Sequence, residues 1–208
     1  MNFRRVIPCK PMNLVKADIV LKKVYDFLDF YGFKPRICYG TLLGAVRNND
    51  FISNDGDIDL ILDKKYYKNV VNIVFNFVVE GCLIRCVEDD IVKLEWDGVC
   101  VDLYFFSERN LIDKLLNRVT WRHKWRTCFI DNFYLIDESF VEIRGCKYRS
   151  LFFPKFWLYS TYGSDWMIPQ NKKGNTWTLT TKIRYFLTDF RKYRFREFKK
   201  GIRFFWRV

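Results

Sequence analysis

Apolar residues recur at helical spacing near the start of the chain. Between Leu14 and Tyr31 they fall at every third or fourth position, with lysine and aspartate between them, and Gly32 follows as a stop signal. This pattern predicts an amphipathic helix over that stretch. A second helix is predicted over residues 65–80, where an apolar run ends at Gly81.

A strand is predicted at residues 35–39, which are short, apolar and led by proline, and a short helix at residues 40–47 follows it directly. The turn between them contains Gly40 and Thr41. A strand that runs through glycine into a helix is a phosphate-binding geometry, because the first backbone amides of the helix point outward.

The segment at residues 57–62 alternates so that Asp57 and Asp59 face one side of a strand and apolar residues face the other. Two such charges at about 4 Å repel by roughly 4 kcal/mol in an effective dielectric near 20, so the pair favours a divalent cation or a shared proton. With no histidine or cysteine nearby in the sequence, Mg²⁺ or Mn²⁺ is the expected ion. An isolated pair of this kind is more commonly solvated or caps a helix.

A third carboxylate, Asp102, favours a metal site over solvated or helix-capping carboxylates. Residues 93–106 predict a hairpin that turns at residues 97–98, and Asp102 lies in its apolar second strand. A carboxylate in such a strand is costly to bury without a partner, and a metal shared with Asp57 and Asp59 would supply one.

Three further elements complete the prediction. A hairpin is expected around Gly145, and helices are expected over residues 110–126 and after Pro154. Together the segments predict an α+β fold in which helices flank a mixed sheet.

Length and composition indicate one catalytic domain. The 208 residues are 50% hydrophobic, enough for a single core, and we expect residues 1–180 to form that domain. The net charge of +12 implies an anionic partner. Residues 181–208 form a basic, aromatic tail, and its end at 191–208 suits peripheral contact with an anionic membrane or RNA stacking. A helix packed on the domain is the alternative.

The cysteines and the apolar segments bear on location. No apolar stretch follows the basic start of the chain, and the longest apolar runs are too short to span a bilayer, so we expect a cytoplasmic protein without a signal peptide. The seven cysteines are odd in number and form no Cys-x-x-Cys pair, which favours reduced structural thiols. A single histidine leaves almost no ligand set for zinc.

Residues 39–60 resemble the LicD family of choline phosphotransferases, which includes fukutin and the fukutin-related protein. Residues 93–106 look like its third-carboxylate strand, and residues 152–169 resemble its closing block. In the first block the matching residues are Gly40, Thr41, Leu42, Leu43, Gly44, Arg47, Phe51, Ile52, Asp55, Asp57, Ile58 and Asp59. In the closing block they are Pro154, Leu158, Tyr162, Gly163, Trp166, Met167 and Pro169. The chain departs from the pattern at Ser53, Asn54 and Gly56, where the family has Pro, Trp and Asp.

The resemblance implies a nucleotidyltransferase fold. It also implies transfer of phosphocholine or a pentitol phosphate from a CDP-linked donor to a glycan or glycolipid acceptor. Asp57 and Asp59 would hold a metal that bridges the donor diphosphate, and Asp102 would complete its coordination or accept the acceptor's proton.

The expected substrate-binding residues are Gly40, Thr41, Arg47 and Asp55. The amides near Gly40, with the Thr41 hydroxyl, would hold phosphate. Arg47 would pair with donor phosphate or with one of the carboxylates. The aromatic residues of the closing block, Trp157, Tyr159, Tyr162 and Trp166, are expected in the core rather than as a base-stacking platform.

Two other functions stay open. A nucleotidyltransferase that moves NMP from NTP to RNA, protein or a small molecule would suit the positive charge. A non-catalytic basic module binding nucleic acid or membrane is disfavoured, because a binder of anions gains nothing from carboxylates in its cleft.

Overall fold

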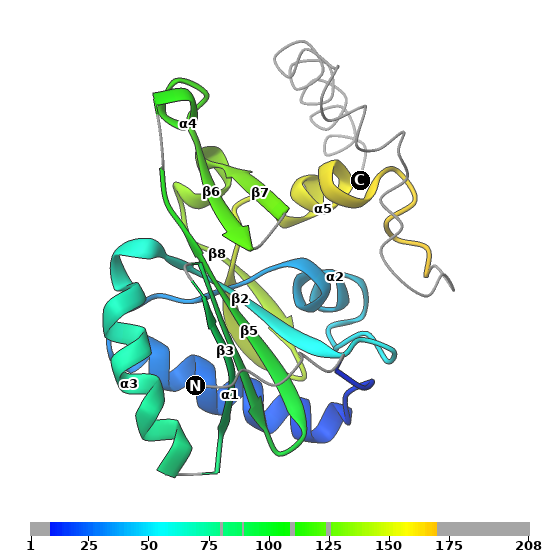
Figure 1. The fold of residues 1–208 in the computed structure, drawn as a ribbon. Helices are drawn as coiled ribbons and strands as arrows, with labels where there is room; N and C mark the ends of the chain where they lie inside the picture. Colours follow the sequence, from blue (N-terminus) through cyan, green and yellow to red (C-terminus); the bar gives the residue numbers. More distant parts are fainter. Residues whose placement is uncertain (1–8, 80, 89, 109–110, 124–125, 170–208) are drawn as a thin grey trace. The chain divides into compact units, whose positions relative to one another are not determined.

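The computed structural model describes residues 9–79, 81–88, 90–108, 111–123 and 126–169 (Figure 1). The chain divides into two compact units, residues 1–163 and 164–208, and the elements below belong to the first. The predicted tail at 181–208 lies outside the described residues, and its boundary with the catalytic domain stays a prediction.

Seven strands of the described chain form one mixed sheet in the order β3-β4-β5-β2-β1-β9-β8. At its centre β2 runs parallel to β5, and β1 lies antiparallel to β2 and parallel to β9. This architecture confirms the predicted α+β class. The strands are β1 (Arg36–Ile37), β2 (Asp57–Asp63), β3 (Leu83–Glu88), β4 (Ile91–Trp96), β5 (Val99–Phe106), β8 (Ser139–Ile143) and β9 (Cys146–Ser150).

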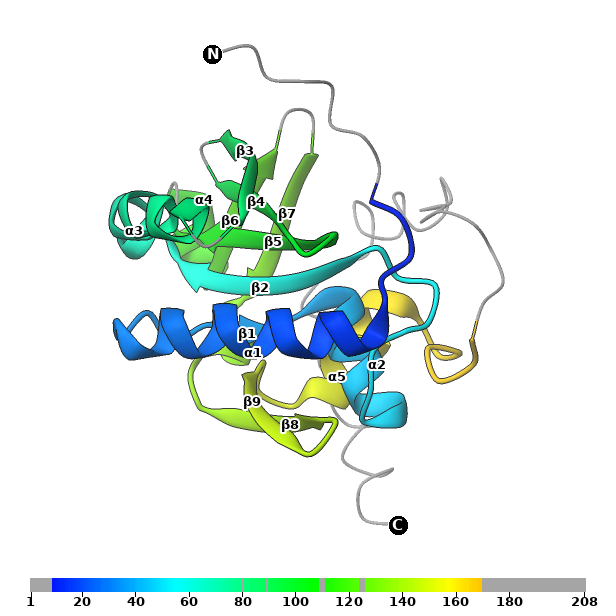
Figure 2. The ribbon, with the colours of Figure 1, turned by 90° about the horizontal axis from the view of Figure 1, so that it is seen from below.

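Helices flank the sheet on both sides. Helices α1 and α3 lie together, with the rings of Phe27 and Phe77 4.3 Å apart, and Figure 2 shows α1 running alongside the strands. Helices α2 and α5 meet on the opposite side, where the rings of Tyr39 and Trp157 are 5.6 Å apart (Figure 1). No helix in the described part of the chain is both long and apolar enough for a bilayer span. The helices are α1 (Leu14–Phe30), α2 (Tyr39–Asn48), η1 (Lys64–Tyr66), α3 (Tyr67–Val79), α4 (Leu111–Leu115), η2 (Asn132–Leu135) and α5 (Pro154–Tyr162).

Local sequence signals explain the boundaries of α1 and of the hairpins. Asn13 caps α1, since its Oδ1 accepts hydrogen bonds from two first-turn amides, and Gly32 with φ of 76° follows its end. Asp97 and Gly98 both have positive φ, as a two-residue type I′ turn requires. Arg144 and Gly145 repeat this geometry between β8 and β9, so both predicted hairpins are confirmed.

The helix predicted over residues 110–126 is wrong. Helix α4 is followed at once by a separate two-stranded hairpin, β6 (Arg118–His123) and β7 (Arg126–Asp131). The helix ends at Leu115, Asn117 in the following turn has a φ of 49°, and the β-branched Thr120 then bridges to Ser107 after β5. The Thr120 hydroxyl also donates a hydrogen bond to the buried Asp113 at 3.1 Å. Pairing with the end of β5 therefore overrides the helical pattern.

The expectation that the cysteines are all reduced is wrong for one pair. Cys9 and Cys100, 91 residues apart, form a disulfide. The sequence contains no signal for this bond because the two residues meet only through the tertiary fold. The free cysteines are Cys38, Cys82, Cys86, Cys128 and Cys146.

Gly44 lets the loop after α2 approach the helix closely. A Cβ at this position would lie 2.4 Å from the carbonyl oxygen of Asp50 and 3.0 Å from the amide nitrogen of Ile52. Because both atoms belong to the backbone, a side-chain rotation cannot relieve the clash.

We therefore expect Gly44→Ala to lower the free energy of unfolding by about 1 to 3 kcal/mol in urea denaturation. Asn48→Ala, at an exposed position of the same helix, is the control and should be neutral or stabilising. If Gly44→Ala is as stable as the wild type, this close approach does not exist.

Candidate active site

Three carboxylates meet on adjacent parallel strands. In the pairing of β2 with β5, Asp59 lies directly opposite Asp102, and Asp57 lies two residues before Asp59 on the same face. One oxygen from each of the three lies within 4.8 Å of the others. The structure thus brings together the residues that the sequence proposed as a cluster.

The start of α2 holds Asp59 in place. The Gly40 amide donates a hydrogen bond to Asp59 Oδ2 at 3.0 Å, and the Asp59 amide donates to Thr41 Oγ1 at 2.8 Å. The backbone carbonyl of Asp59 accepts from the Cys38 amide at 3.1 Å. Gly40 and Thr41 therefore orient a carboxylate, and their predicted contact with phosphate stays a prediction.

Asp55 also lies at this helix start. A Cβ on Gly40 would come within 2.2 Å of Asp55 Oδ2 and 3.4 Å of Asp59 Oδ2, so glycine makes room for both carboxylates. The Gly56 amide donates a hydrogen bond to Asp55 Oδ1 at 3.0 Å. Asp55 thus lies beside the cluster, and its predicted role in substrate binding stays a prediction.

Lys93 and Tyr104 belong to this site, although neither was singled out from the sequence. Lys93 of β4 lies opposite Asp102 of β5, and its ammonium group contacts Asp102 Oδ2. The Tyr104 hydroxyl lies 3.1 Å from Asp59 Oδ1 and 3.2 Å from Asp102 Oδ2. The side chain of Lys93 is therefore a positive charge at the edge of the carboxylate cluster.

The sequence does contain a signal for both residues. The two-residue turn at residues 97–98 places Trp96 opposite Val99, and counting outward from this pair places Lys93 opposite Asp102. Residues two apart on a strand share a face, so Tyr104 must lie beside Asp102.

Arg47 lies in the last turn of α2. Burial lowers the pKa of Arg47, and the nearby Tyr162 of α5 acts in the opposite direction. The pKa of Tyr162 is raised by burial and then by the charge of Asp59, which places α5 near the site. Whether Arg47 pairs with phosphate or with a carboxylate stays a prediction. Of the four aromatic residues predicted in the core, Trp157 is buried, whereas Tyr159, Tyr162 and Trp166 are partly exposed.

A family model describes the part of the chain that builds this site. The LicD/FKTN/FKRP nucleotidyltransferase domain matches residues 35–158, more than half of the sequence. The chain belongs to this family. The match runs from the strand before Gly40 to α5 and contains all three carboxylates, and the domain it describes is that of a transferase.

Two solved structures are similar to the structure of this chain. The lincosamide antibiotic adenylyltransferase LnuA, solved with lincomycin bound, is 13% identical with a TM-score of 0.47, covering 69% of this chain and 82% of that one. A candidate nucleotidyltransferase from Thermotoga maritima is 17% identical with a TM-score of 0.42, covering 93% and 96%. The strand order of the sheet and the family match define the fold. No curated protein sequence matches the chain.

Lys93 only partly compensates the negative charge of the carboxylates in this LicD domain. The pKa of Asp57 is raised to about 7 by burial and then by the charges of Asp102 and Asp55, while Lys93 opposes the shift. The pKa of Asp59 is raised well above its usual value by burial and then by the charges of Asp57, Asp55 and Asp102. Burial also raises the pKa of Asp55. The cluster therefore resists full ionisation unless a further cation joins it.

This donor set fits a hard divalent cation. Carboxylate oxygens are the ligands that Mg²⁺ and Mn²⁺ prefer, and one ammonium group cannot balance four carboxylates. Cys38 lies nearby, but burial and the adjacent carboxylates raise the pKa of its thiol well above the usual value. A soft thiolate ligand is therefore not available at neutral pH.

The raised pKa of Asp57 predicts how the metal-free protein responds to pH. The folded state holds this proton more tightly than a free aspartate with a pKa of 3.8 does. The resulting stabilisation is complete below the unfolded pKa and is lost as the pH rises through about 7. In EDTA, the Tm of the wild type relative to Asp57→Asn should fall between about pH 4 and pH 7.

Asp97→Asn is the matched control for this measurement, because it makes the same chemical change in an exposed turn where asparagine also tolerates positive φ. Its pH profile should follow the wild type. Parallel profiles for the wild type and Asp57→Asn would contradict the shift.

Proposed function

We propose that the protein is a divalent-cation-dependent phosphotransferase. It would move a phosphate-linked group, such as phosphocholine or a pentitol phosphate, from a CDP-linked donor to a hydroxyl of a glycan or glycolipid. The observation that carries this proposal is the cluster of Asp57, Asp59 and Asp102 with ligand oxygens within 4.8 Å. Its place in a LicD domain supports a nucleotide-linked donor, and the resemblance to choline phosphotransferases favours CDP.

Each carboxylate has a proposed role that follows from its surroundings. Bound Mg²⁺ or Mn²⁺ would neutralise charge on the donor diphosphate. We assign Asp57, Asp59 and Asp102 to hold that ion. The Gly40 amide and the Tyr104 hydroxyl each contact an oxygen of Asp59, so this ligand is oriented before the donor arrives.

Asp57 is the proposed acceptor of the hydroxyl proton. Asp59 and Asp102 are only 5% and 2% exposed, whereas Asp57 is partly exposed and can be reached by an acceptor from solvent. The acceptor oxygen would then attack the phosphorus atom of the phosphocholine or pentitol phosphate, the bond from that phosphorus to the bridging oxygen would break, and CMP would leave.

Lys93 is the proposed partner of donor phosphate. Its side chain is 20% exposed, and its ammonium group lies at the edge of the carboxylates rather than among them. An ammonium at this place can exchange its contact with Asp102 for a phosphate oxygen when the donor binds.

The second candidate is transfer of NMP from an NTP, which the net charge of +12 and the nucleotidyltransferase domain support. It differs from the first in its leaving group, pyrophosphate instead of CMP. A basic module without catalysis is disfavoured by the cluster of buried carboxylates.

The proposed metal site predicts a cation-dependent stability. Millimolar Mn²⁺ or Mg²⁺ should raise the Tm of the wild type, because cation binding relieves repulsion among the three carboxylates. Asp57→Asn should abolish the rise, and Asp97→Asn should preserve it. An equal rise in Asp57→Asn would remove Asp57 from the metal site.

The reaction type predicts distinct products. A thermal-shift screen of CDP-choline, CDP-ribitol, CDP-glycerol and the four NTPs identifies the donor. With a CDP-linked donor, phosphorus NMR should show CMP and a new phosphodiester. Asp59→Asn should lower turnover by at least about a hundredfold while circular dichroism shows an intact fold. Pyrophosphate as the Asp59-dependent product would establish NMP transfer instead.

A further inference from the structure

Residues 9–12, here called the N-terminal strap, connect the start of the described chain to the carboxylate site. Cys9 is bonded to Cys100 of β5, and the Met12 amide donates a hydrogen bond to the carbonyl oxygen of Asp55 at 2.9 Å. Met12 is itself buried. The strap therefore joins β5 to the loop that leads into β2.

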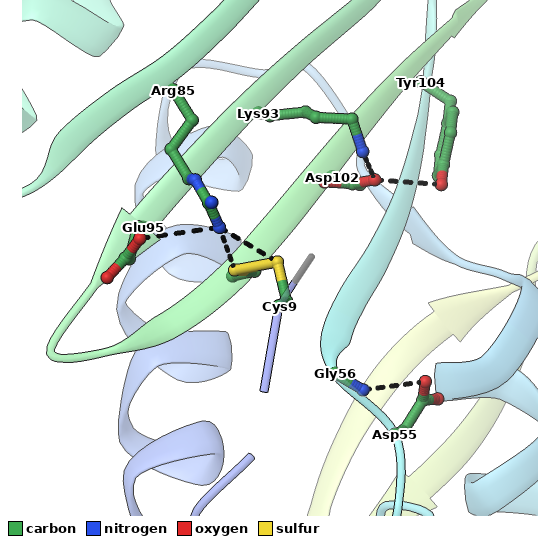
Figure 3. Close-up of a disulfide and its surroundings, with 9 residues drawn as sticks. Cys9, Asp55, Gly56, Arg85, Lys93, Glu95, Asp102 and Tyr104 are labelled. Carbon is green, nitrogen blue, oxygen red and sulfur yellow. Dashed lines mark hydrogen bonds and ion pairs between the residues drawn. A yellow bond between two sulfur atoms is a disulfide. The ribbon is translucent and has the colours of Figure 1, made fainter. Parts of the chain in front are cut away.

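The disulfide lies beside the metal-binding carboxylates. Cys100 pairs with Asp57 across β5 and β2, and it shares a strand face with Asp102 two residues later. Figure 3 shows the disulfide on the strand that also carries Asp102 and Tyr104, with the loop of Asp55 and Gly56 nearby. The disulfide is therefore attached to β5 at the residue paired with Asp57.

The guanidinium of Arg85 contacts both sulfurs of the disulfide. Arg85 Nη1 lies 3.1 Å from Cys9 Sγ and 2.9 Å from Cys100 Sγ (Figure 3). The same guanidinium lies 3.5 Å from Glu95 Oε2, and Glu95 is paired with Cys100 across β4 and β5. The bond is thus held by strands β3, β4 and β5.

Gly56 leaves the room that the strap needs. A Cβ at this position would lie 3.1 Å from the carbonyl oxygen of Cys9 and 3.3 Å from its Cβ, tighter than ordinary van der Waals contact. Gly56 is also the position where the sequence lacks an aspartate of the resembled pattern. A side chain at position 56 would therefore occupy space that the strap fills.

We propose that the Cys9–Cys100 disulfide positions the metal-binding carboxylates by holding the N-terminal strap against the loop of Asp55, Gly56 and Asp57. Cleavage of this bond by a dithiol would then weaken divalent-cation binding. The inference rests on the proposed function, since it concerns the same carboxylates.

The redox step is ordinary thiol–disulfide exchange. A thiolate of the dithiol attacks one sulfur and forms a mixed disulfide, and its second thiol then displaces the protein sulfur. Two electrons and two protons pass to Cys9 and Cys100, and the dithiol leaves as a cyclic disulfide. The strap then keeps only its non-covalent contacts with the loop.

The first experiment measures Mn²⁺ affinity by calorimetry in the full-length protein. Cys9→Ser/Cys100→Ser should bind Mn²⁺ roughly tenfold more weakly than the oxidised wild type, the scale expected when support around metal ligands is lost. Cys146→Ser, which removes a free cysteine of β9, should bind like the wild type. A dithiol should weaken binding in the wild type and leave the double variant unchanged.

Alkylation in denaturant without reductant should label five of the seven cysteines, leaving Cys9 and Cys100 unlabelled. Labelling of these two in the purified protein would overturn the inference. Equal Mn²⁺ affinity in the wild type and Cys9→Ser/Cys100→Ser would overturn it as well, while leaving the metal site intact. Absence of Mn²⁺ binding in the oxidised wild type would overturn the proposed metal dependence together with the inference.

Gly56→Ala tests the same coupling by displacing the strap while the disulfide stays in place. The added methyl should displace the strap and weaken Mn²⁺ binding in the wild type. In the Cys9→Ser/Cys100→Ser background the strap can move aside, so the same change should have a smaller effect. Equal effects in the two backgrounds would show that Gly56 and the disulfide act independently, and would overturn the inference.

Discussion

The structure depends on one electrostatic constraint, the burial of like charges on neighbouring strands. The parallel pairing of β2 with β5 sets Asp59 opposite Asp102 and brings Asp57 beside them. Burial and mutual repulsion raise the pKa of Asp57 and Asp59, so the arrangement needs compensating contacts to persist. Most of the features around the site supply such contacts.

The compensating groups come from elements whose packing also builds the fold. Helix α2 begins with Gly40, whose amide donates to Asp59, and with Thr41, whose hydroxyl accepts from the Asp59 amide. From the other side β4 contributes Lys93. Because α2 approaches Asp55 and Asp59 closely at Gly40, the packing at the start of this helix also positions the carboxylates. Substitutions at Gly40 should therefore affect stability and cation binding together.

The disulfide connects this site to the redox state of its surroundings. Disulfides persist in oxidising compartments and are reduced in the presence of cellular dithiols. The oxidation state of Cys9 and Cys100 in cells would therefore indicate where the protein acts. It would also show whether the disulfide holds the strap permanently or releases it on reduction.

Local patterns were sufficient for most of the fold. Helical periodicity predicted α1 and α3, alternation predicted the shared face of Asp57 and Asp59, and turn residues predicted the β4–β5 and β8–β9 hairpins. The segment at 110–126 failed because its pairing with Ser107 after β5 is a long-range contact, which periodicity does not encode.

For the site, the sequence by itself determined the three carboxylates and the glycine at the start of α2, because strand alternation and motif spacing are local properties. Only the tertiary structure decided that Thr41 faces the backbone of Asp59 and that Tyr104 reaches two carboxylates. It alone joined Cys9 to Cys100 across 91 residues. The physical reason is that these contacts arise from the order of strands in the sheet, which brings together side chains that are distant along the chain.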